Sequence, residues 1–447
     1  MHRLLLLMPL FLTACYVGDD VIERVSPEDI LNGQVAQFAV DANYGSFTWN
    51  NDPNTLDHDS NYEYVFDRLP LSASLESVPW TGSYWPENEG GISHRWQTGE
   101  QHEYRLLAPD EIAAASQETI RTLSPAEKYD LYVGAQDWPL TIAVQAATSP
   151  EDPSWTGYCH GWAPAALTYD EPSPIEVVGA TGIRIPFGSA DIKALLTYFE
   201  GEVSQTSHYS ESLGPWARNP LSMGGNCQST SPDDSNCYDT NPAALHVVMA
   251  NRIGLEGLGL IADVDPSSEK WNQPVFRYDS NVLTRQAPSP GASPDAVEEL
   301  VVSSRVAWTV EIEPRWETAS PPVHDRQVLY SLELNEFREV VGGQWLYQLN
   351  TNDFLTYHQT LKALREWDEG QDGTPDLSDD AVRYWMQEWF KVIDFAWVLK
   401  PGGFSDTFRQ ADSGYSFFAP TTSSRAHLFD YMAQLEVLYE ASISEVQ

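Results

Sequence analysis

The sequence predicts an α+β fold, in which a helix and an antiparallel sheet form the core and additional helices follow at the C-terminus. Three observations support this fold class. A helix begins near Cys159, in the stretch "GYCHGWAPAAL". Hydrophobic and polar residues alternate over residues 306–313 and 328–334, which is typical of half-buried strands. From about residue 350 onward the spacing of apolar residues becomes helical.

The N-terminus predicts export. Arg3 and a short apolar run make residues 1–14 a secretory signal peptide. The run ends in Leu-Thr-Ala-Cys, which resembles a bacterial lipobox, so Cys15 is expected to carry a lipid anchor. The alternative is an ordinary signal cleaved at a nearby small residue. We therefore expect an exported lipoprotein of the bacterial outer membrane or cell surface, which contacts the membrane through its lipid anchor only.

Composition narrows the range of partners. The formal net charge of −40 repels nucleic acid and anionic lipid surfaces, so neither is an expected partner. The 16 tryptophans and 21 tyrosines favour a packed core over disorder. After the signal, no stretch is apolar for the ~20 residues that a transmembrane helix needs.

The chain divides into four predicted segments: a signal peptide (1–14), a lipid-anchored spacer (15–60), a catalytic domain (61–349) and a helical C-terminal region (350–447). Further elements are predicted by capping residues, apolar periodicity and turn signals. They are a helix over 110–130, two short strands and a helix over 175–201, a buried strand in "GLGLIADVD", and C-terminal helices over 355–367, 379–399 and 423–442.

The four cysteines have different expected roles. Cys15 belongs to the signal. Cys227 and Cys237 lie in a polar Gly/Ser/Asp loop, where an exported protein would form a disulfide. A metal site there is less favoured, because no second Cys or His pair lies nearby at ligand spacing. Cys159 is the remaining cysteine, and a single extra thiol in an exported protein is either buried or chemically active.

Cys159 is predicted to be a nucleophile. A helix N-terminus and a nearby histidine both lower the pKa of a thiol, and only the thiolate attacks. The surrounding Gly157, His160, Gly161 and Pro164 are poor residues for filling a core. The alternative is a buried, inert cysteine.

Several histidines could serve as the base. His160 adjoins Cys159, and neighbouring helix side chains diverge; His208 lies in a polar segment. His246 lies in an apolar element, and Asp263 follows on a predicted strand, where its carboxylate would fix the imidazole tautomer. We therefore expect a Cys159–His246–Asp263 triad. The alternative for His246 is a satisfied core histidine. Asp265 and Asn272 are further candidates to orient the imidazole.

Several blocks of the sequence resemble the transglutaminase elicitor family of oomycetes and marine bacteria. "EKWNQPVFRYDS", residues 269–280, is similar to the family's surface peptide, and "GYCHGWAPAAL" resembles its active-site segment. Three more blocks, "PFGSADIKALLTYF", "NPAALHVVMANRIG" and "VGGQWL", also resemble the family, and the similarity runs from about residue 69 to 345.

This resemblance implies a Ca²⁺-dependent protein-glutamine γ-glutamyltransferase on a papain-like cysteine-peptidase scaffold, with Cys159 as nucleophile, His246 as base and Asp263 as acid. The sequence departs from the pattern around the shared Trp-Asn-Gln-Pro-Val core, at Lys270 and Phe276–Arg277. Papain-like enzymes place a Gln oxyanion donor six residues before the cysteine, where this chain has Pro153. The second oxyanion donor is therefore unassigned, and the indole N–H of Trp155 is the remaining candidate.

An acidic loop between two predicted helices approaches the EF-hand pattern for Ca²⁺. Its carboxylates are Asp368, Asp372, Asp376 and Asp379. The loop has Gly at the third position, and its last position is Asp in place of the longer Glu. The alternative is a solvated acidic turn.

These expectations combine into an exported transglutaminase that joins a glutamine to a lysine or another amine through a thioester, acting on protein substrates that bear Gln and Lys. The first alternative is a cysteine protease, or an amidase or deamidase, with the same triad. The second is a non-catalytic surface recognition protein that would use an aromatic patch. That patch would comprise Trp80, Tyr84, Trp85 and Trp96.

Overall fold

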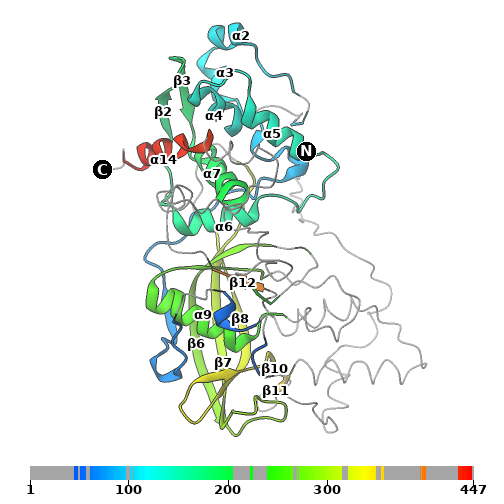
Figure 1. Ribbon diagram of the computed structural model, residues 1–447, viewed down its shortest axis with the longest axis vertical. Coiled ribbons are helices and arrows are strands. Elements are labelled where there is room, and N and C mark those ends of the chain that lie inside the picture. Colours follow the sequence, from blue (N-terminus) through cyan, green and yellow to red (C-terminus); the bar gives the residue numbers. More distant parts are fainter. Residues whose placement is uncertain are drawn as a thin grey trace, which may run out of the picture.

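A computed structural model gives the fold (Figure 1). It describes residues 45–48, 51–56, 61–96, 101–102, 104–204, 222–224, 239–264, 269, 271–314, 321–348, 354–356, 393, 395–398 and 431–444. Helices gather at one end of the molecule and long strands at the other, and helix α6 lies where the two ends meet. We call these ends the helical lobe (80–204 with 431–444) and the sheet lobe (the large sheet, residues 239–256 and the segments before residue 76).

In the described part of the chain, eight strands form the large sheet, and every strand pair in it is antiparallel. In sheet order they are β4 (Ser222–Gly224), β12 (Phe395–Trp397), β5 (Leu260–Ala262), β6 (Gln273–Gln286), β7 (Glu298–Thr309), β8 (Val323–Leu334) and β9 (Val340–Gly342), with β1 (Ser72–Ser74) on β6. Two small hairpins are separate: β2 (Ile175–Val178) with β3 (Arg184–Phe187), and β10 (Leu346–Gln348) with β11 (Phe354–Thr356).

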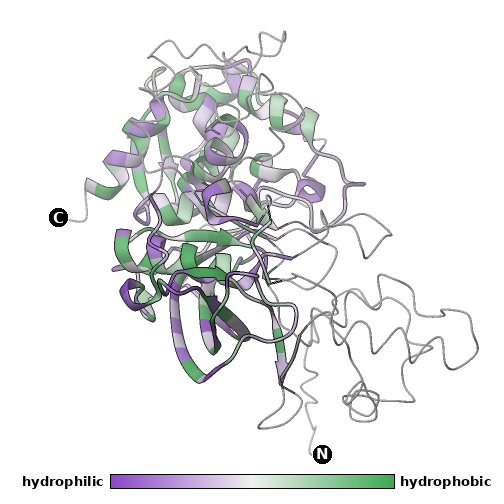
Figure 2. Cartoon of the chain, turned by 60° about the horizontal axis from the view of Figure 1, so that its bottom comes forward, coloured by the Kyte–Doolittle hydropathy of each residue, from purple (hydrophilic) through white to green (hydrophobic). Residues whose placement is uncertain are grey.

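The strands expected from alternation are confirmed over 306–309 and 328–334, whereas residues 310–313 lie beyond the end of β7. Hydrophilic and hydrophobic residues follow one another along them (Figure 2). Val306 and Trp308 of β7, and Tyr330 and Leu332 of β8, join the core of the sheet lobe, as a period of two requires. Helix α9 (Pro242–Met249) covers this core together with the π-helical segment η9 (Ala250–Glu256) and the 3-10 turns η2 (Pro53–Thr55) and η3 (Phe66–Arg68).

The helical lobe contains most of the helices. They are α2 (Pro109–Ala114), α3 (Gln117–Arg121), α4 (Pro125–Val133), α5 (Pro139–Ala147), α6 (Cys159–Thr168), α7 (Ser189–Tyr198) with the π-helical turn η6 (Phe199–Ser204), α14 (Gln434–Ser444), and the 3-10 turns η4 (Glu87–Glu89) and η5 (Gly91–Ser93). The single helix expected over 110–130 is wrong, because Ser116 and Ser124 each cap a new helix and Pro125 begins the last one.

A buried ion pair joins α4 to α7. Lys128 Nζ lies 2.7 Å from Asp191 Oδ2, and the indole N–H of Trp96 donates to the other carboxylate oxygen. Burial lowers the pKa of Lys128 to about 8, although the charge of Asp191 opposes this shift. Removing either partner would leave a buried charge uncompensated, so the pair fixes how these two helices pack.

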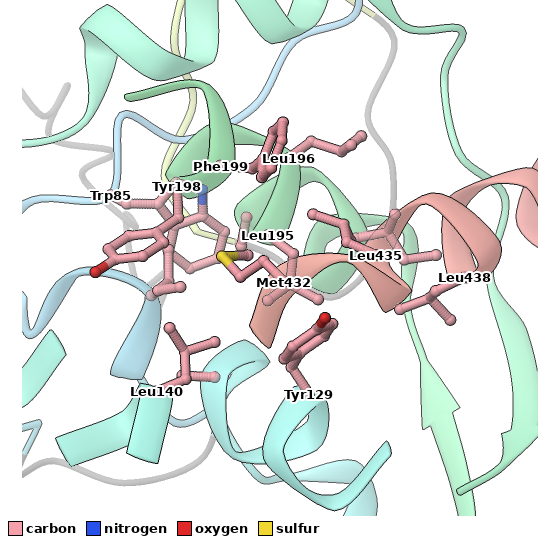
Figure 3. Packing of buried hydrophobic residues seen from close by; sticks show 14 of the residues in the cluster. Trp85, Tyr129, Leu140, Leu195, Leu196, Tyr198, Phe199, Met432, Leu435 and Leu438 are labelled. Carbon is pink, nitrogen blue, oxygen red and sulfur yellow. The ribbon is translucent and has the colours of Figure 1, made fainter. Parts of the chain in front are cut away.

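The C-terminal helix completes the core of the helical lobe. Met432, Leu435 and Leu438 pack with Tyr129 of α4 and Leu195 of α7 (Figure 3). The helix predicted over 423–442 is thus confirmed from Gln434 to its predicted end, and α14 continues to Ser444; residues 423–430 lie outside the described ranges.

Two other predicted C-terminal helices contain strands. Residues 354–356 form β11, and residues 395–397 form β12, which pairs with β4 and β5 of the large sheet. The helix prediction is therefore wrong at these residues, because pairing with a distant strand overrides local periodicity. The other residues of these predicted helices lie outside the described ranges.

The α+β prediction is confirmed. The two short strands over 175–187, the following helix and the buried strand before Asp263 also form where expected. None of the described helices is both long enough and apolar enough to cross a bilayer.

Candidate active site

Cys159 is the first residue of α6, as the sequence predicts. Gly157 makes this start possible, because a side chain there would meet the carbonyl oxygens of Tyr84 and Trp85 at 2.6 and 2.9 Å. The next main-chain N–H, of Tyr158, donates to the same Tyr84 carbonyl at 2.6 Å. The segment 84–86 therefore holds the chain that leads into the helix.

A second glycine brings α6 against its neighbours. A Cβ on Gly161 would lie 2.0 Å from the carbonyl oxygen of Thr197, at the end of α7. Only glycine permits this approach of two backbones. Cys159 is 5% exposed, and its position in the first turn places the sulfur at the positive end of the helix dipole. This location favours a thiolate.

The sheet lobe presents one face of β5 and β6 to this helix. Ile261 belongs to the core of the helical lobe, and it pairs with Pro274 of β6 and Trp397 of β12. Side chains alternate along a strand, so Asn272 and Asp263 share that face.

Asn272 contacts the thiol directly. Its side-chain Nδ2 lies 3.4 Å from Cys159 Sγ and donates to it. Its Oδ1 accepts the indole N–H of Trp397 at 2.9 Å. The two lobes thus meet at the sulfur. Asn272, expected from the sequence to orient an imidazole, contacts the thiol in the structure.

His160 is the imidazole next to Cys159. Its Nε2 lies 3.3 Å from Glu202 Oε1 on η6, and its side chain is one-third exposed. Burial lowers the pKa of His160, but hydrogen bonds to Cys159 and Glu202 and the negative charges of both raise it to about 10. The imidazole is therefore a cation at neutral pH.

Asp263 directly follows β5 and is fully buried. Its Oδ2 accepts the main-chain N–H of Trp271 at 3.2 Å, and Trp271 precedes Asn272. The ring of Trp271 packs edge-on against Tyr84, with centroids 5.4 Å apart. Asp263 therefore holds the turn that carries Asn272.

His246 lies elsewhere, and its assignment as the base is wrong. Its Nδ1 lies 2.8 Å from the hydroxyl of Tyr330. Tyr330 pairs with Val302, which pairs with Val282, ten positions along β6 from Asn272. At ~3.3 Å per residue, ten strand residues span roughly 30 Å. An imidazole bound to Tyr330 is thus far beyond hydrogen-bond reach of Cys159.

His246 is instead a core histidine of the sheet lobe. It is fully buried on α9 and its ring stacks on Phe66. Burial lowers its pKa to about 4, so it is neutral at physiological pH. A core histidine is the alternative that the sequence allows. The apolar residues around His246 predict that its helix packs on the sheet, but they do not predict where along the strands.

Of the remaining expected site residues, the structure describes only Trp155. Trp155 is partly exposed in the turn before Gly157. Residues Cys15, Cys227, Cys237, Asp265, Asp368, Asp372, Asp376 and Asp379 lie outside the described ranges. Among the residues that are described, no cluster of three or more His, Cys, Asp or Glu side chains could hold a metal ion.

Aromatic residues near the site belong mainly to the core. Trp80 and Trp85 are 2% and 1% exposed, and Trp96 donates its N–H to the buried Asp191. Tyr84 is the exception: burial and the negative charges of Glu89, Glu311, Cys159 and Glu269 raise its pKa to about 12. This places Tyr84 in the acidic surroundings of the thiol.

Sequence reasoning missed Trp397, Glu202 and the role of His160. Trp397 lies in a run with helical spacing, and nothing local marks it as a partner of residue 272. The divergence of adjacent helix side chains argues against His160, yet Cys159 and His160 occupy the first turn, where both reach the same end of the helix. Glu202, on the π-helical turn after α7, carried no sequence signal.

Comparisons with known proteins bear on this site. The transglutaminase elicitor family model matches residues 148–363, which include Cys159, His160, Asp263 and Asn272. The crystal structure of the GP42 transglutaminase from Phytophthora sojae matches at 20% identity with a TM-score of 0.49, covering 82% of this chain and 98% of that chain. No curated protein matches the chain.

Proposed function

Because residues 148–363 belong to the transglutaminase elicitor family, we propose that this protein is a cysteine acyltransferase that transfers the acyl group of a glutamine side chain to an amine. One observation carries the proposal. The Cys159 thiol lies at a helix N-terminus, where both the Asn272 amide and the His160 imidazole contact it. Each of these features stabilises a thiolate.

The first half of the reaction forms a thioester. The Cys159 thiolate attacks the γ-carboxamide carbon of a substrate glutamine, and the carbonyl oxygen becomes an oxyanion. The main-chain N–H of Cys159, in the first turn of α6, is suited to donate to this oxyanion. The His160 imidazolium gives its proton to the departing nitrogen, so that ammonia leaves and the acyl group stays on sulfur.

The second half uses the same imidazole as a base. Part of the high pKa of His160 comes from the charge of the Cys159 thiolate. Acylation removes that charge, so the pKa of the imidazole falls. Neutral His160 can then take a proton from the attacking amine, which forms the isopeptide bond and restores the thiolate.

Acidic side chains around the thiol favour an amine over water as the acceptor. Glu311 accepts from Gln273, Glu269 from Trp271, and Glu202 lies beside His160. Their negative potential concentrates cations, including the ammonium of lysine, near the thioester. Hydrolysis of the thioester, which makes the protein a deamidase, is the alternative for the same residues.

An amine-incorporation assay tests the proposal. Purified protein, a glutamine donor peptide and a fluorescent amine should give a labelled peptide. Labelling should disappear in Cys159→Ala and fall at least 100-fold in His160→Ala, as removal of a general acid–base does. His324→Ala, an exposed histidine on β8, serves as the matched control and should keep full activity.

Each other outcome has a defined meaning. Ammonia release without labelling would assign the protein as a deamidase. Labelling that survives Cys159→Ala would refute the cysteine mechanism. If neither activity appears with any donor, the recognition protein becomes the better account, although burial of Trp80 and Trp85 removes much of its aromatic patch.

Ca²⁺ binding at Asp368, Asp372, Asp376 and Asp379 is a separate proposal that rests on the sequence pattern alone. Calorimetric titration with Ca²⁺ should show binding that is lost when Asp368→Ala and Asp372→Ala are combined. An unchanged titration in this double variant would remove the site.

Lipidation of Cys15 and export also remain proposals from the sequence, and so does the Cys227–Cys237 disulfide. Globomycin, which blocks processing of lipoprotein signals, should leave the unprocessed chain in a bacterial host if Cys15 is lipidated. Intact mass before and after reduction should differ by two hydrogens if the disulfide is present.

A further inference from the structure

The side chain of Asn272 is held between two groups that require opposite ends of its amide. The indole N–H of Trp397 lies 2.9 Å from one end, and the sulfur of Cys159 lies 3.4 Å from the other. An indole nitrogen can only donate a hydrogen bond. The end that faces Trp397 must therefore be the carbonyl oxygen, and the NH₂ group faces the thiol.

From this geometry we propose that Trp397 is a positioning residue for the nucleophile: it fixes the Asn272 amide with its N–H toward Cys159 and thereby stabilises the thiolate. The inference rests on the proposed acyl transfer for its biological purpose. The stabilisation of the thiol itself, however, can be measured without any substrate.

The energetics depend on the orientation of the amide. A rotated Asn272 would place its NH₂ against the indole N–H, so that two donors face each other. It would also place its carbonyl oxygen against a negatively charged sulfur. Asn272 is 7% exposed, so solvent does little to compensate for either contact.

Strand pairing provides the rigidity that this role needs. Trp397 pairs with Ile261, and Ile261 pairs with Pro274, two residues after Asn272. The three strands β12, β5 and β6 thus fix the backbone of both side chains, and diagonal neighbours on one face are within reach of a long side chain. Residue 397 comes from a part of the chain outside the family match at 148–363.

The experiment measures how fast iodoacetamide alkylates Cys159 as a function of pH. Peptide mass spectrometry of the Cys159 peptide separates this thiol from the other cysteines. The midpoint of the profile reports the pKa of the thiol. The variants are Trp397→Phe, which keeps a ring without the donor, and Asn272→Asp, which keeps the shape but replaces the NH₂ group by an oxygen.

Loss of a charge-assisted hydrogen bond should raise the midpoint by about one pH unit in Trp397→Phe and by more in Asn272→Asp. In the double variant the Trp397→Phe effect should vanish, because the indole acts only through the amide. Trp345→Phe is the matched control: its indole N–H donates to the Thr240 carbonyl at the same 2.9 Å in the sheet lobe. It should leave the midpoint unchanged.

Three results would overturn the proposal. They are an unchanged midpoint in Trp397→Phe, an unchanged midpoint in Asn272→Asp, and additive effects in the double variant. If Trp397→Phe does not keep the wild-type circular dichroism spectrum, Trp397→Leu removes the same donor, and Asn272→Asp tests the contact with the sulfur independently. Shifted midpoints in a protein without amine incorporation would refute the proposed function while leaving this inference intact.

Discussion

Asn272 donates its side-chain N–H to the sulfur of Cys159, so the residue before β6 contacts the first residue of α6. These residues come from different lobes and lie 113 positions apart in the chain. The contact places the thiol at the junction of the lobes. A correct site therefore depends on how the two lobes pack.

The corrected role of His246 leads to the first prediction. His246→Phe should leave the alkylation profile of Cys159 unchanged, because Tyr330, which binds this imidazole, lies level with Val282, ten positions along the chain from Asn272. The same substitution should alter the pH dependence of stability. The pKa of His246 is about 4 in the folded protein and near 6.5 when unfolded, so the wild type loses stability as pH falls from about 6.5 to about 4.

Urea unfolding at pH 7.5 and pH 5 checks this second part. The stability of wild type relative to His246→Phe should decrease at the lower pH, and His324→Phe should show no such change. A folded His246→Phe protein whose Cys159 has become unreactive would contradict the placement of His246.

The contribution of Glu333 to stability should depend on pH in the direction opposite to that of His246. It is fully buried on β8, directly across from Glu299, and its Oε2 accepts the main-chain N–H of Ser293 at 2.6 Å. Burial raises its pKa to about 7. The pKa is 4.5 in the unfolded chain, so the protonated carboxyl makes its full contribution to stability below that pH. This contribution, on the order of 3 kcal/mol, is lost as the pH rises through about 7.

Glu333→Gln mimics the protonated side chain, so it should be more stable than wild type at pH 8 and nearly equal to it at pH 4.5. Thermal unfolding at both values measures the difference. Glu336→Gln, an exposed residue in the turn after β8, should have no effect at either pH. Greater stability of the wild type at pH 8 would show that Glu333 is ionised and well solvated.

The C-terminal helix offers a test of the helical lobe. Leu435 of α14 is fully buried and packs in the core that contains Tyr129 (Figure 3). Leu435→Ala should lower the free energy of unfolding by about 2–5 kcal/mol, as expected for a cavity in a packed core. Val437 on the same helix is 55% exposed, so Val437→Ala should change it by less than ~0.5 kcal/mol. Equal effects would contradict the docking of α14.

Much of this fold could be predicted from local sequence. The helix that begins at Cys159 is marked by a run of small and apolar residues after Gly157, and β7 and β8 show alternation over several residues. Asp263 is a candidate because it lies on a predicted buried strand, "GLGLIADVD". In each case the signal depends on residues close together in the chain.

The errors arose where long-range pairing decides. An apolar helix that carries His246 can cover either end of a long sheet, and the register of β6, β7 and β8 decides which. Trp397 lies in a segment with helical spacing, yet it pairs with β5. The contact of His160 with Glu202 depends on a π-helical turn, which no periodicity predicts.

The central claim is that Cys159 carries the acyl group of a glutamine. Intact mass spectrometry of the protein after rapid mixing with a donor peptide, quenched in acid, tests this most directly. The account predicts an added mass equal to the peptide minus ammonia, located on the Cys159 peptide, removed by hydroxylamine and absent in Cys159→Ala. An adduct located on another residue, or labelled amine product formed while Cys159 stays unmodified at every quench time, would contradict it.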